Sequence, residues 1–241
     1  MTTKEDFVLI AQLAQEARRY EDMKSAMKRF VETSSNKELS NEERYLLIIG
    51  YKQIIAQYRK SIRILKQTRS RKSYFDQLVD NYLQQIETEL KLVINEFIEL
   101  LDKYLIPSAQ KHLEVKCLYL KLKSDFLRYL LDLNTINDYQ KQNLKTQTHS
   151  AFKIAFECIN SNLNACNPIR LSFALSYSTF FYQILLMPDK AFDFAKQAFD
   201  SGLMELEYVK NEQQRKDCKL FIQLLRDRLI LWTQILDESK I

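Results

Sequence analysis

Glycine and proline are scarce in this chain, whose 241 residues include two glycines and three prolines. Tight turns, and the loops that wrap phosphates in nucleotide-binding proteins, depend on glycine because it adopts backbone conformations closed to other residues. With Gly50 and Gly202 as the two glycines, neither a GxGxxG fingerprint nor a Walker loop can be present. The scarcity excludes glycine-loop nucleotide binding and favours long helices joined by few sharp turns.

Cysteine and histidine are also few, which weakens the case for catalysis or metal binding. His112 and His149 lie in polar segments near expected helix ends, so both are expected at the surface rather than in a catalytic role. No local motif groups serine, histidine and aspartate. The cysteines lack CxxC spacing, so reduced, mostly buried thiols are expected rather than a zinc site. The sequence predicts no enzymatic activity, no metal and no cofactor. The four cysteines are Cys117, Cys158, Cys166 and Cys218.

Long hydrophobic runs are missing as well. No run approaches the ~18 residues that a membrane-spanning helix needs, and the N-terminal segment MTTKEDF lacks the apolar centre of a signal peptide. The formal net charge of +5 permits an acidic or phosphorylated partner without demanding nucleic acid. These features predict a protein of the cytoplasm, with the nucleus as a second compartment, and no membrane or nucleic-acid partner.

Helical periodicity is the main positive signal. Hydrophobic residues make up 46% of the chain and recur every three to four positions, as in amphipathic helices. Ser40 with Glu43 gives the capping-box signal that begins a helix, and Pro107 is expected to end one at Leu105. No linker divides the chain, so one all-α domain of nine antiparallel helices, 1–236, is expected with a short tail, 237–241. The expected helices are 4–18, 21–32, 41–71, 74–105, 113–133, 138–162, 168–186, 188 to about 202, and 211–237.

The third expected helix carries a row of cations. At about 100° per residue, Lys52, Arg59 and Arg63 fall within roughly 40° of one another, with no acidic residue among them. Such a row on a rigid helix can receive a phosphate-sized anion. Isoleucines 48, 49 and 55 lie beside the row, and an apolar face for packing lies opposite. The opposite face comprises Leu47, Ile54, Tyr58 and Leu65.

The basic segment 59–72, RKSIRILKQTRSRK, has two interpretations. A solvated helix end explains it simply, since cations are favoured near a helix C-terminus. A patch for nucleic acid or lipid is the alternative, although the segment lacks the interleaved aromatic residues of a single-strand binder. The sequence favours the solvated helix end and leaves the other open.

Two later helices also bear on binding. In the fifth, Lys121, Asp125 and Arg128 share one side with Tyr129 adjacent; the arginine fork and tyrosine hydroxyl suit a phosphate, although an ordinary amphipathic helix explains the same pattern. The last helix has two apolar stripes, so either it is wholly buried or one stripe lines a groove. One stripe comprises Leu220, Phe221, Leu224, Leu231 and Ile235, and the other comprises Ile222, Leu225, Leu229 and Trp232.

Together these segments resemble the 14-3-3 family. RYLLIIGYKQIIAQYRK is similar to the first signature of that family and KDCKLFIQLLRDRLILWTQ to its second, and LKSDFLRYL, NPIRLSFALSYSTFFYQIL and DKAFDFAKQAFD match in order between them. The resemblance covers about residues 5–234. It implies an all-helical, cup-shaped bundle that dimerises through its first four helices. It also implies a non-catalytic adaptor that binds phosphoserine or phosphothreonine peptides of client proteins in an amphipathic groove.

The resemblance assigns roles to individual residues. Lys52, Arg59, Arg128 and Tyr129 match the phosphate pocket of the family. Residues 1–105 correspond to a dimerisation half that carries part of this pocket, and residues 113–236 to a groove half. The groove positions are Lys121, Leu175, Ser176, Thr179, Gln183, Phe221, Leu224, Arg228, Leu231 and Trp232.

Three groove positions depart from the family pattern. Ser176 and Arg228 stand where the family usually has asparagines that clamp the ligand backbone, and Gln183 stands for a glutamate. A serine hydroxyl is shorter than an amide and cannot make its bidentate contact. Phosphate capture with an altered sequence preference is therefore expected. The alternatives are a helical scaffold with weakened phosphopeptide binding, and a helical-repeat module that binds peptides or nucleic acid through 59–72.

The expected dimer surface is mixed. Arg19 and Glu89 match an inter-subunit ion pair of the family, whereas Asp22 faces Gln85 in place of a lysine. A homodimer, or a heterodimer with another family member, is expected, because exposed ion pairs contribute only ~0–1 kcal/mol. Phosphorylation of Ser61 would favour the monomer. A phosphorylated Ser239 could occupy the groove. The sequence leaves the identity of the clients and the preferred phosphopeptide motif open. The interface positions are Leu13, Ala17, Arg19, Asp22, Ser61, Leu65, Tyr82, Gln85 and Glu89.

Overall fold

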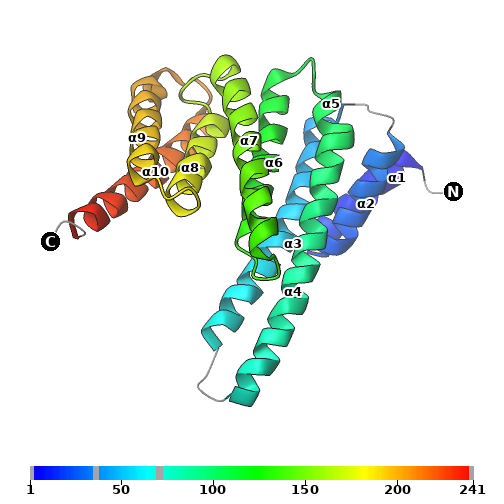
Figure 1. Ribbon diagram of the computed structural model, residues 1–241. Helices are drawn as coiled ribbons and strands as arrows, with labels where there is room; N and C mark the ends of the chain where they lie inside the picture. Colours follow the sequence, from blue (N-terminus) through cyan, green and yellow to red (C-terminus); the bar gives the residue numbers. More distant parts are fainter. Residues whose placement is uncertain (1–2, 35–37, 69–72, 239–241) are drawn as a thin grey trace. The chain divides into compact units, whose positions relative to one another are not determined.

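The computed structural model describes residues 3–34, 38–68 and 73–238, and this part of the chain is helical without strands. Because α4, a π turn and α5 run on without a break, these ranges contain nine long helices, which confirms the predicted all-α fold (Figure 1). The helices are α1 (Lys4–Glu16), α2 (Tyr20–Thr33), α3 (Asn41–Thr68), α4 (Ser73–Leu100), η1 (Leu101–Leu105, the π turn), α5 (Ile106–Ser108), α6 (Leu113–Leu131), α7 (Asp138–Asn162), α8 (Pro168–Gln183), α9 (Pro188–Glu205), η2 (Leu206–Tyr208, a 3₁₀ turn) and α10 (Glu212–Glu238).

Several helix ends differ from the sequence prediction, and two of these differences have a clear physical cause. Pro107 does not end the fourth helix at Leu105, since η1 and α5 extend it to Ser108. Proline has no N–H for the carbonyl four residues before it, and the π turn replaces that bonding pattern directly ahead of the ring. The end of α8 lies at Gln183 rather than Leu186, because Leu186 adopts a left-handed φ of 55° that a helix cannot contain. The predicted end of the third helix, Arg71, and Ser239 lie outside the described residues.

The chain divides into two compact units, and the divisions fall just before α6, inside α6 and inside α7. The first unit comprises Met1–Lys111 with Tyr129–Leu144, and the second His112–Arg128 with Lys145–Ile241. The functional halves expected from the sequence, 1–105 and 113–236, are a separate division and remain a prediction.

In the first unit, consecutive helices from α1 to α4 pack against one another, and α3 and α4 run antiparallel side by side (Figure 1). Tyr51 of α3 is fully buried, and its ring stacks on Phe97 of α4 with centroids 4.4 Å apart. Gly50 allows α2 close to α3, since a Cβ there would lie 3.3 Å from the backbone nitrogen of Lys24. This packing fixes the face of α3 that carries the cations.

A carboxylate at Glu96 joins three helices of this unit. It accepts hydrogen bonds from Lys28 Nζ of α2 and from Tyr51 Oη of α3, both at 2.7 Å, and Lys24 Nζ lies 3.6 Å away. Burial alone would raise the pKa of Glu96, but these hydrogen bonds and lysine charges outweigh it and lower that pKa. The ionised form of Glu96 therefore stabilises the folded state.

Acid is expected to destabilise the protein through Glu96. Because its folded pKa lies below the unfolded value, the unfolded state binds more protons as the pH falls through and below about 4.5. The free energy of unfolding should therefore drop with acidification, and Glu96→Gln should show less stability near neutral pH and a shallower drop. Urea unfolding at a series of pH values measures this. Glu16→Gln on the exposed end of α1 is the control, and a wild-type slope in Glu96→Gln would contradict the role.

Glu87 anchors the segment between α6 and α7. Its side chain is 1% exposed and accepts hydrogen bonds from the backbone N–H groups of Asn134 (2.7 Å) and Thr135 (3.0 Å) and from the Asn134 amide (3.1 Å). Lys66 Nζ lies 3.7 Å from the same carboxylate. These contacts satisfy a buried charge and hold the chain that follows Tyr129.

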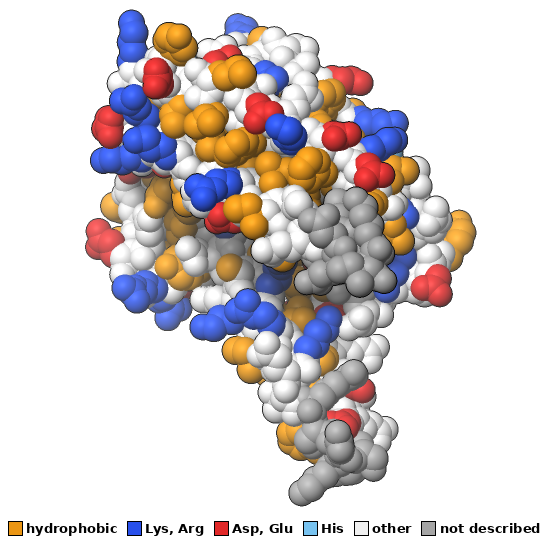
Figure 2. Space-filling view, turned by 90° about the vertical axis from the view of Figure 1, so that its left-hand side faces the viewer, with side chains coloured by type: hydrophobic (Ala, Val, Ile, Leu, Met, Phe, Trp, Pro, Cys, Tyr) orange, Lys and Arg blue, Asp and Glu red, His pale blue; other side chains and the backbone are white. Residues whose placement is uncertain are grey.

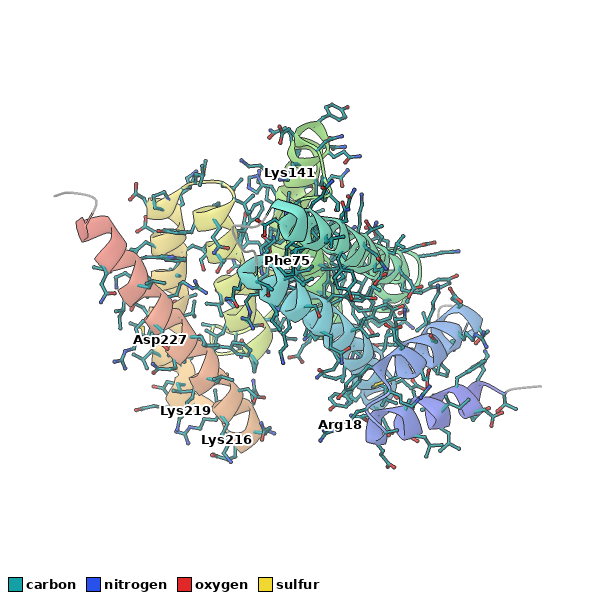
Figure 3. All side chains as sticks on the ribbon, turned by 90° about the horizontal axis from the view of Figure 1, so that it is seen from below. Arg18, Phe75, Lys141, Lys216, Lys219 and Asp227 are labelled. Atoms are coloured by element: carbon teal, nitrogen blue, oxygen red, sulfur yellow. The ribbon has the colours of Figure 1, made fainter. Side chains whose placement is uncertain are left out.

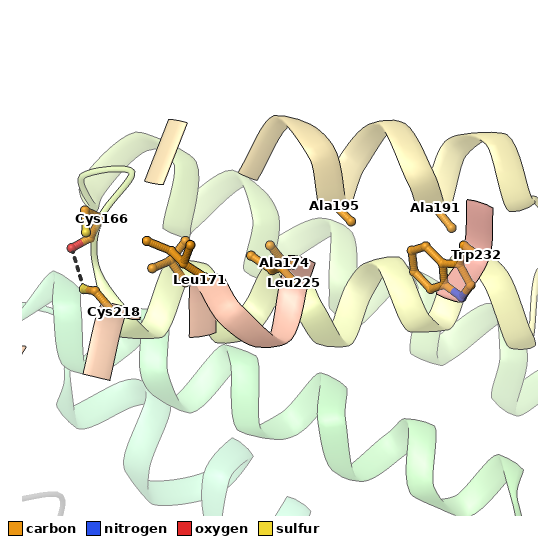
Figure 4. Close-up of a cluster of buried hydrophobic side chains, with 9 residues drawn as sticks. Cys166, Leu171, Ala174, Ala191, Ala195, Cys218, Leu225 and Trp232 are labelled. Atoms are coloured by element: carbon orange, nitrogen blue, oxygen red, sulfur yellow. Dashed lines mark hydrogen bonds between the residues drawn. The ribbon is translucent and has the colours of Figure 1, made fainter. Parts of the chain in front are cut away.

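In the second unit, α8, α9 and α10 pack against each other around a small core (Figure 4). Ala174, Ala191 and Ala195 allow close approach of the helices, and Leu225 and Trp232 of α10 fill the space between them. Trp232 is 2% exposed, and its ring stacks on Tyr182 at 4.9 Å. The core therefore holds one face of α10 inward. None of the described helices is both long enough and apolar enough to span a membrane.

Candidate functional site

The cation row on α3 is exposed, as the helical wheel predicts. Lys52, Arg59 and Arg63 all face solvent, whereas Ile48 and Ile55 beside them are buried. The opposite face is buried at Leu47 and Ile54, and Tyr58 and Leu65 are half-buried. Ile48 and Ile55 pack on one flank of the cations, whereas Ala56 and Lys60 on the other flank are exposed.

Arg59 is held against Tyr129. Its guanidinium carbon lies 4.0 Å from the centroid of the Tyr129 ring, a cation–π contact within the first unit. One guanidinium nitrogen also lies 3.9 Å from an Asp132 carboxylate oxygen, with both side chains nearly half exposed. This long, solvated ion pair is weak, so Asp132 does not neutralise the site. Stacking fixes the plane of the guanidinium, whose N–H donors lie along its edge.

A hollow of about 310 Å³ opens beside this contact in the first unit. Among the described residues, its wall carries three cations and one carboxylate, with apolar surface from Ile62, Leu90 and Leu133. The excess of positive charge suits an anion. Lys52 does not line the hollow, whereas Arg63 and Lys66 do. The charged and aromatic lining residues are Arg59, Arg63, Lys66, Tyr129 and Asp132.

A larger cavity of the same unit, about 710 Å³, is unsuited to phosphate. Among the residues that the structure describes, its charged lining comprises Asp80, Glu87 and Lys66, and the two carboxylates would repel an anion. None of the residues predicted for binding lines this cavity. Charge rather than volume selects the hollow at Arg59 as the candidate site.

The remaining two basic candidates belong to the second unit and lie on α6. Lys121 Nζ is 2.7 Å from Asp125 Oδ2, and both side chains are about nine-tenths buried. The predicted groove lysine is therefore paired, and its charge is partly balanced by Asp125. Arg128 is half-buried in the last turn of α6.

The structure excludes one of the two interpretations of the last helix. On α10, Ile222, Leu225 and Trp232 are buried, but Leu220, Leu224 and Leu231 are 57%, 39% and 45% exposed. The helix is thus not wholly buried, and its other apolar stripe is open. Figure 2 shows one face of the molecule, on which hydrophobic side chains gather among charged side chains of both signs. The side chain of Ile235 lies outside the described residues.

Trp232 is more buried than the other residues predicted for the groove wall. It is 2% exposed and its ring stacks on Tyr182, so it also belongs to the core, and its place in the groove wall remains a prediction. Arg228, half-buried one turn earlier, has its guanidinium carbon 5.9 Å from the Trp232 ring centroid. Trp232 thus supports the open face of α10 from behind.

The α8 candidates form a graded surface. Leu175 and Ser176 are half-buried, and Gln183 is exposed at the helix end. Thr179 is 8% exposed, and its hydroxyl donates to the Leu175 carbonyl at 2.7 Å. Leu175, Ser176 and Gln183 therefore keep surface that a ligand can reach, and Thr179 mainly packs.

Comparison with known proteins identifies the family of this chain. The family model described as 14-3-3 protein matches residues 10–233. The chain belongs to the 14-3-3 family. It is 42% identical over 233 residues to the 14-3-3 protein beta/alpha of Homo sapiens and of Bos taurus, covering 95% of this chain and 92% of each relative. The Gallus gallus protein of that name is also 42% identical and is covered over 93% of its length.

Membership settles the broad role of this 14-3-3 protein. The family consists of non-catalytic adaptors that bind phosphorylated partners and dimerise, so the chain is an adaptor and not an enzyme. Among the residues that the structure describes, no three His, Cys, Asp or Glu side chains gather as a metal site requires.

The proposed dimer surface of this 14-3-3 protein is apolar and exposed on α1 and α4. Leu13 and Tyr82 are 57% and 54% exposed, and Leu9 and Leu78 add to this surface. Ala17, Ser61 and Gln85 are also exposed, and Leu65 and Glu89 are half-buried. Within the single chain, Arg19 pairs with Asp22, and Gln85 donates to Glu89 at 3.0 Å. The Arg19–Glu89 pair expected between subunits remains a prediction.

The burial of His149 differs from the sequence prediction, which placed it at the surface. It lies within α7, half-buried, with its ring centroid 6.0 Å from Phe180 and 6.4 Å from Phe181. Burial, with the charges of Lys153 and Lys190, lowers its pKa and keeps it neutral. The polar neighbours in sequence concealed a helix face that turns toward the α8 aromatics. His112 is exposed just before α6, as predicted.

Some residues of the site carried no sequence signal. Asp132 and Leu133 reach the hollow from the end of α6, and nothing in their spacing connects them to α3. Nor did any sequence pattern indicate that Tyr182 stacks on Trp232. The Lys121–Asp125 pair did have a signal, namely opposite charges four residues apart on one helix.

Proposed function

We propose that this 14-3-3 protein binds phosphoserine or phosphothreonine peptides through Lys52, Arg59, Arg128 and Tyr129. The observation that carries the proposal is the contact of Arg59 with Tyr129 at the edge of a cationic hollow. A phosphomonoester carries nearly two negative charges and three acceptor oxygens. Arginine forks and a lysine ammonium pair with such a group through charge-assisted hydrogen bonds, each contributing about 1.5–3 kcal/mol.

The groove of the proposal uses the open stripe of α10 and the reachable part of α8. Leu224 and Leu231 supply exposed apolar surface for peptide side chains, and Leu175 adds a half-buried neighbour. Phe221 is half-buried and Arg228 adds a cation among them. In this proposal Lys121 both stabilises α6 through its ion pair with Asp125 and contacts the peptide outside the phosphate.

An altered sequence preference is the finer part of the proposal. Ser176 offers one hydroxyl in place of an amide, so it cannot both donate to and accept from a peptide backbone. Arg228 brings positive charge, and Gln183 replaces a negative one. Both changes favour acidic over basic residues beside the phosphoserine. A like-charge neighbour would weaken binding of ligands with flanking arginines.

Reversal of the two departures should restore an ordinary preference. The double variant Ser176→Asn/Arg228→Asn is expected to shift relative affinities in a phosphopeptide panel by about 5–20-fold toward peptides with flanking arginines. The variant regains one or two hydrogen bonds to the peptide backbone and loses the positive charge of Arg228. Fluorescence polarisation with peptides that differ only beside the phosphoserine measures the ranking. Gln223→Asn on α10 is the control. An unchanged ranking would remove the altered preference but leave phosphate binding intact.

The competing proposal is a scaffold that no longer binds phosphate. It rests on the same departures at Ser176 and Arg228, and a phosphopeptide that binds no better than its unphosphorylated form would favour it. We further propose that the protein dimerises, with itself or another family member, through the predicted interface residues of its first four helices. Cytoplasmic and nuclear location, and the lack of nucleic-acid and membrane partners, remain predictions.

A further inference from the structure

Two cysteines of the second unit lie in contact. The Sγ atoms of Cys117 in α6 and Cys158 in α7 are 3.2 Å apart, although the residues are 41 positions apart in the sequence. Sulfur atoms in a disulfide are about 2.05 Å apart, so a movement of roughly 1 Å would close the bond. Cys117 is fully buried and Cys158 is half-buried. A small reagent from solvent therefore reaches Cys158 first.

We propose that Cys117 and Cys158 form a site of reversible oxidation, at which a hydroperoxide such as hydrogen peroxide converts the two thiols into a disulfide between α6 and α7. In the first step, the Cys158 sulfur attacks the O–O bond of the peroxide. The O–O bond breaks, Cys158 becomes a sulfenic acid, and the thiol proton leaves in a water molecule. In the second step, the Cys117 sulfur attacks the sulfenic sulfur, the S–O bond breaks, and hydroxide leaves as water with the Cys117 proton. Two thiols are oxidised and one peroxide is reduced to two waters.

The surroundings support this order of steps. Burial, together with the hydrogen bond to Cys158, raises the pKa of Cys117 to about 12. Cys117 is therefore protonated near neutral pH and a poor first nucleophile. Once Cys158 carries the sulfenic acid, Cys117 is already in contact with it. This proximity favours the disulfide over further oxidation of Cys158 to a sulfinic acid.

The other two cysteines provide an internal comparison. Cys218 Sγ donates a hydrogen bond to the Cys166 carbonyl oxygen at 3.0 Å (Figure 4). Both residues are buried, with 0% and 3% exposure. The Cys218 thiol is thus committed to a carbonyl and shielded from solvent. We expect Cys166 and Cys218 to remain reduced while Cys117 and Cys158 react.

The cross-link would stabilise the second unit. It closes a loop of about 40 residues, which reduces the entropy of the unfolded chain and is expected to raise the Tm by about 5–10 °C. Lys121 lies one turn after Cys117 on α6, so the bond would also hold the part of α6 that carries the Lys121–Asp125 pair. Hydrogen exchange of α6 and α7 should slow accordingly.

The test oxidises the full chain with a small excess of hydrogen peroxide under native conditions. The expected product has lost two hydrogen atoms by intact mass, titrates two thiols instead of four after denaturation, and yields a Cys117–Cys158 cross-linked peptide. It should run as a monomer on a non-reducing denaturing gel, and dithiothreitol should reverse both the mass change and the rise in Tm.

Single substitutions identify the pair. Cys158→Ser changes a half-buried side chain and should abolish the cross-link without loss of folding, whereas Cys166→Ser should still form it. A cross-link to any other cysteine, a disulfide only between two chains, a sulfinic acid at Cys158 with Cys117 free, or four free thiols after treatment would each overturn the proposal. None of these results depends on phosphopeptide binding.

Discussion

Replacing Arg59 by glutamate is expected to lower the affinity for a phosphoserine peptide at least ~100-fold, which corresponds to about 2.8 kcal/mol. The substitution removes a fork that the Tyr129 ring holds in place and puts a negative charge beside the phosphate. Two unit charges 4 Å apart near a protein surface interact by about 4 kcal/mol, and the variant changes this from attraction to repulsion. Isothermal calorimetry or fluorescence polarisation measures the loss.

The folding of the Arg59→Glu variant should be preserved because Arg59 is 44% exposed and its ion pair with Asp132 is long. Lys219→Glu is the matched control. It makes the same change in net charge on the exposed side of α10, where the Lys219 side chain projects from the helix (Figure 3). Its affinity should stay within about 2-fold of wild type at physiological salt. Equal losses in both variants would show that net charge alone attracts the peptide.

Replacing Trp232 by alanine is expected to lower the free energy of unfolding by about 3–5 kcal/mol. The ring is 2% exposed, stacks on Tyr182, and completes the core that α8, α9 and α10 share. Its removal leaves a cavity between helices whose backbones are already held close by alanines. Urea or thermal unfolding measures the change, and the Tm should fall by about 6–20 °C.

Leu231→Ala is the control for Trp232→Ala because the two residues are adjacent on α10 but face different surroundings. Leu231 is 45% exposed, so its loss should change the free energy of unfolding by less than about 1 kcal/mol. If Leu231 lines the groove, its variant should instead weaken peptide binding. If Trp232→Ala keeps wild-type stability but binds peptide more weakly, Trp232 acts mainly in the groove wall and the stability prediction is wrong.

The spacing of hydrophobic residues, together with capping residues and prolines, was sufficient to predict where the helices lie. The capping box at Ser40 and the prolines at 168 and 188 mark helix starts that the structure reproduces. Pro107 misled because a π turn ahead of it absorbs the missing N–H. Leu186 misled because an apolar residue in a left-handed conformation continues the helical pattern in sequence while ending the helix in space. Such local backbone choices depend on tertiary contacts that a single sequence does not display.

The site was predictable in part. A helical wheel correctly places Lys52, Arg59 and Arg63 on the exposed strip of α3. The contact of Arg59 with Tyr129 joins residues 70 positions apart, and only the resemblance paired them. Burial separates two further cases that the sequence left open: Trp232 fills a core, and Lys121 is held in a buried ion pair.

The most direct test of phosphate recognition is a crystal structure of the full chain with a bound phosphoserine peptide. We expect the phosphate oxygens to lie within hydrogen-bonding distance of Lys52 Nζ, the guanidinium groups of Arg59 and Arg128, and the Tyr129 hydroxyl. We also expect peptide side chains to contact Leu224 and Leu231. A phosphate bound elsewhere, or bound without Arg59, would contradict these expectations.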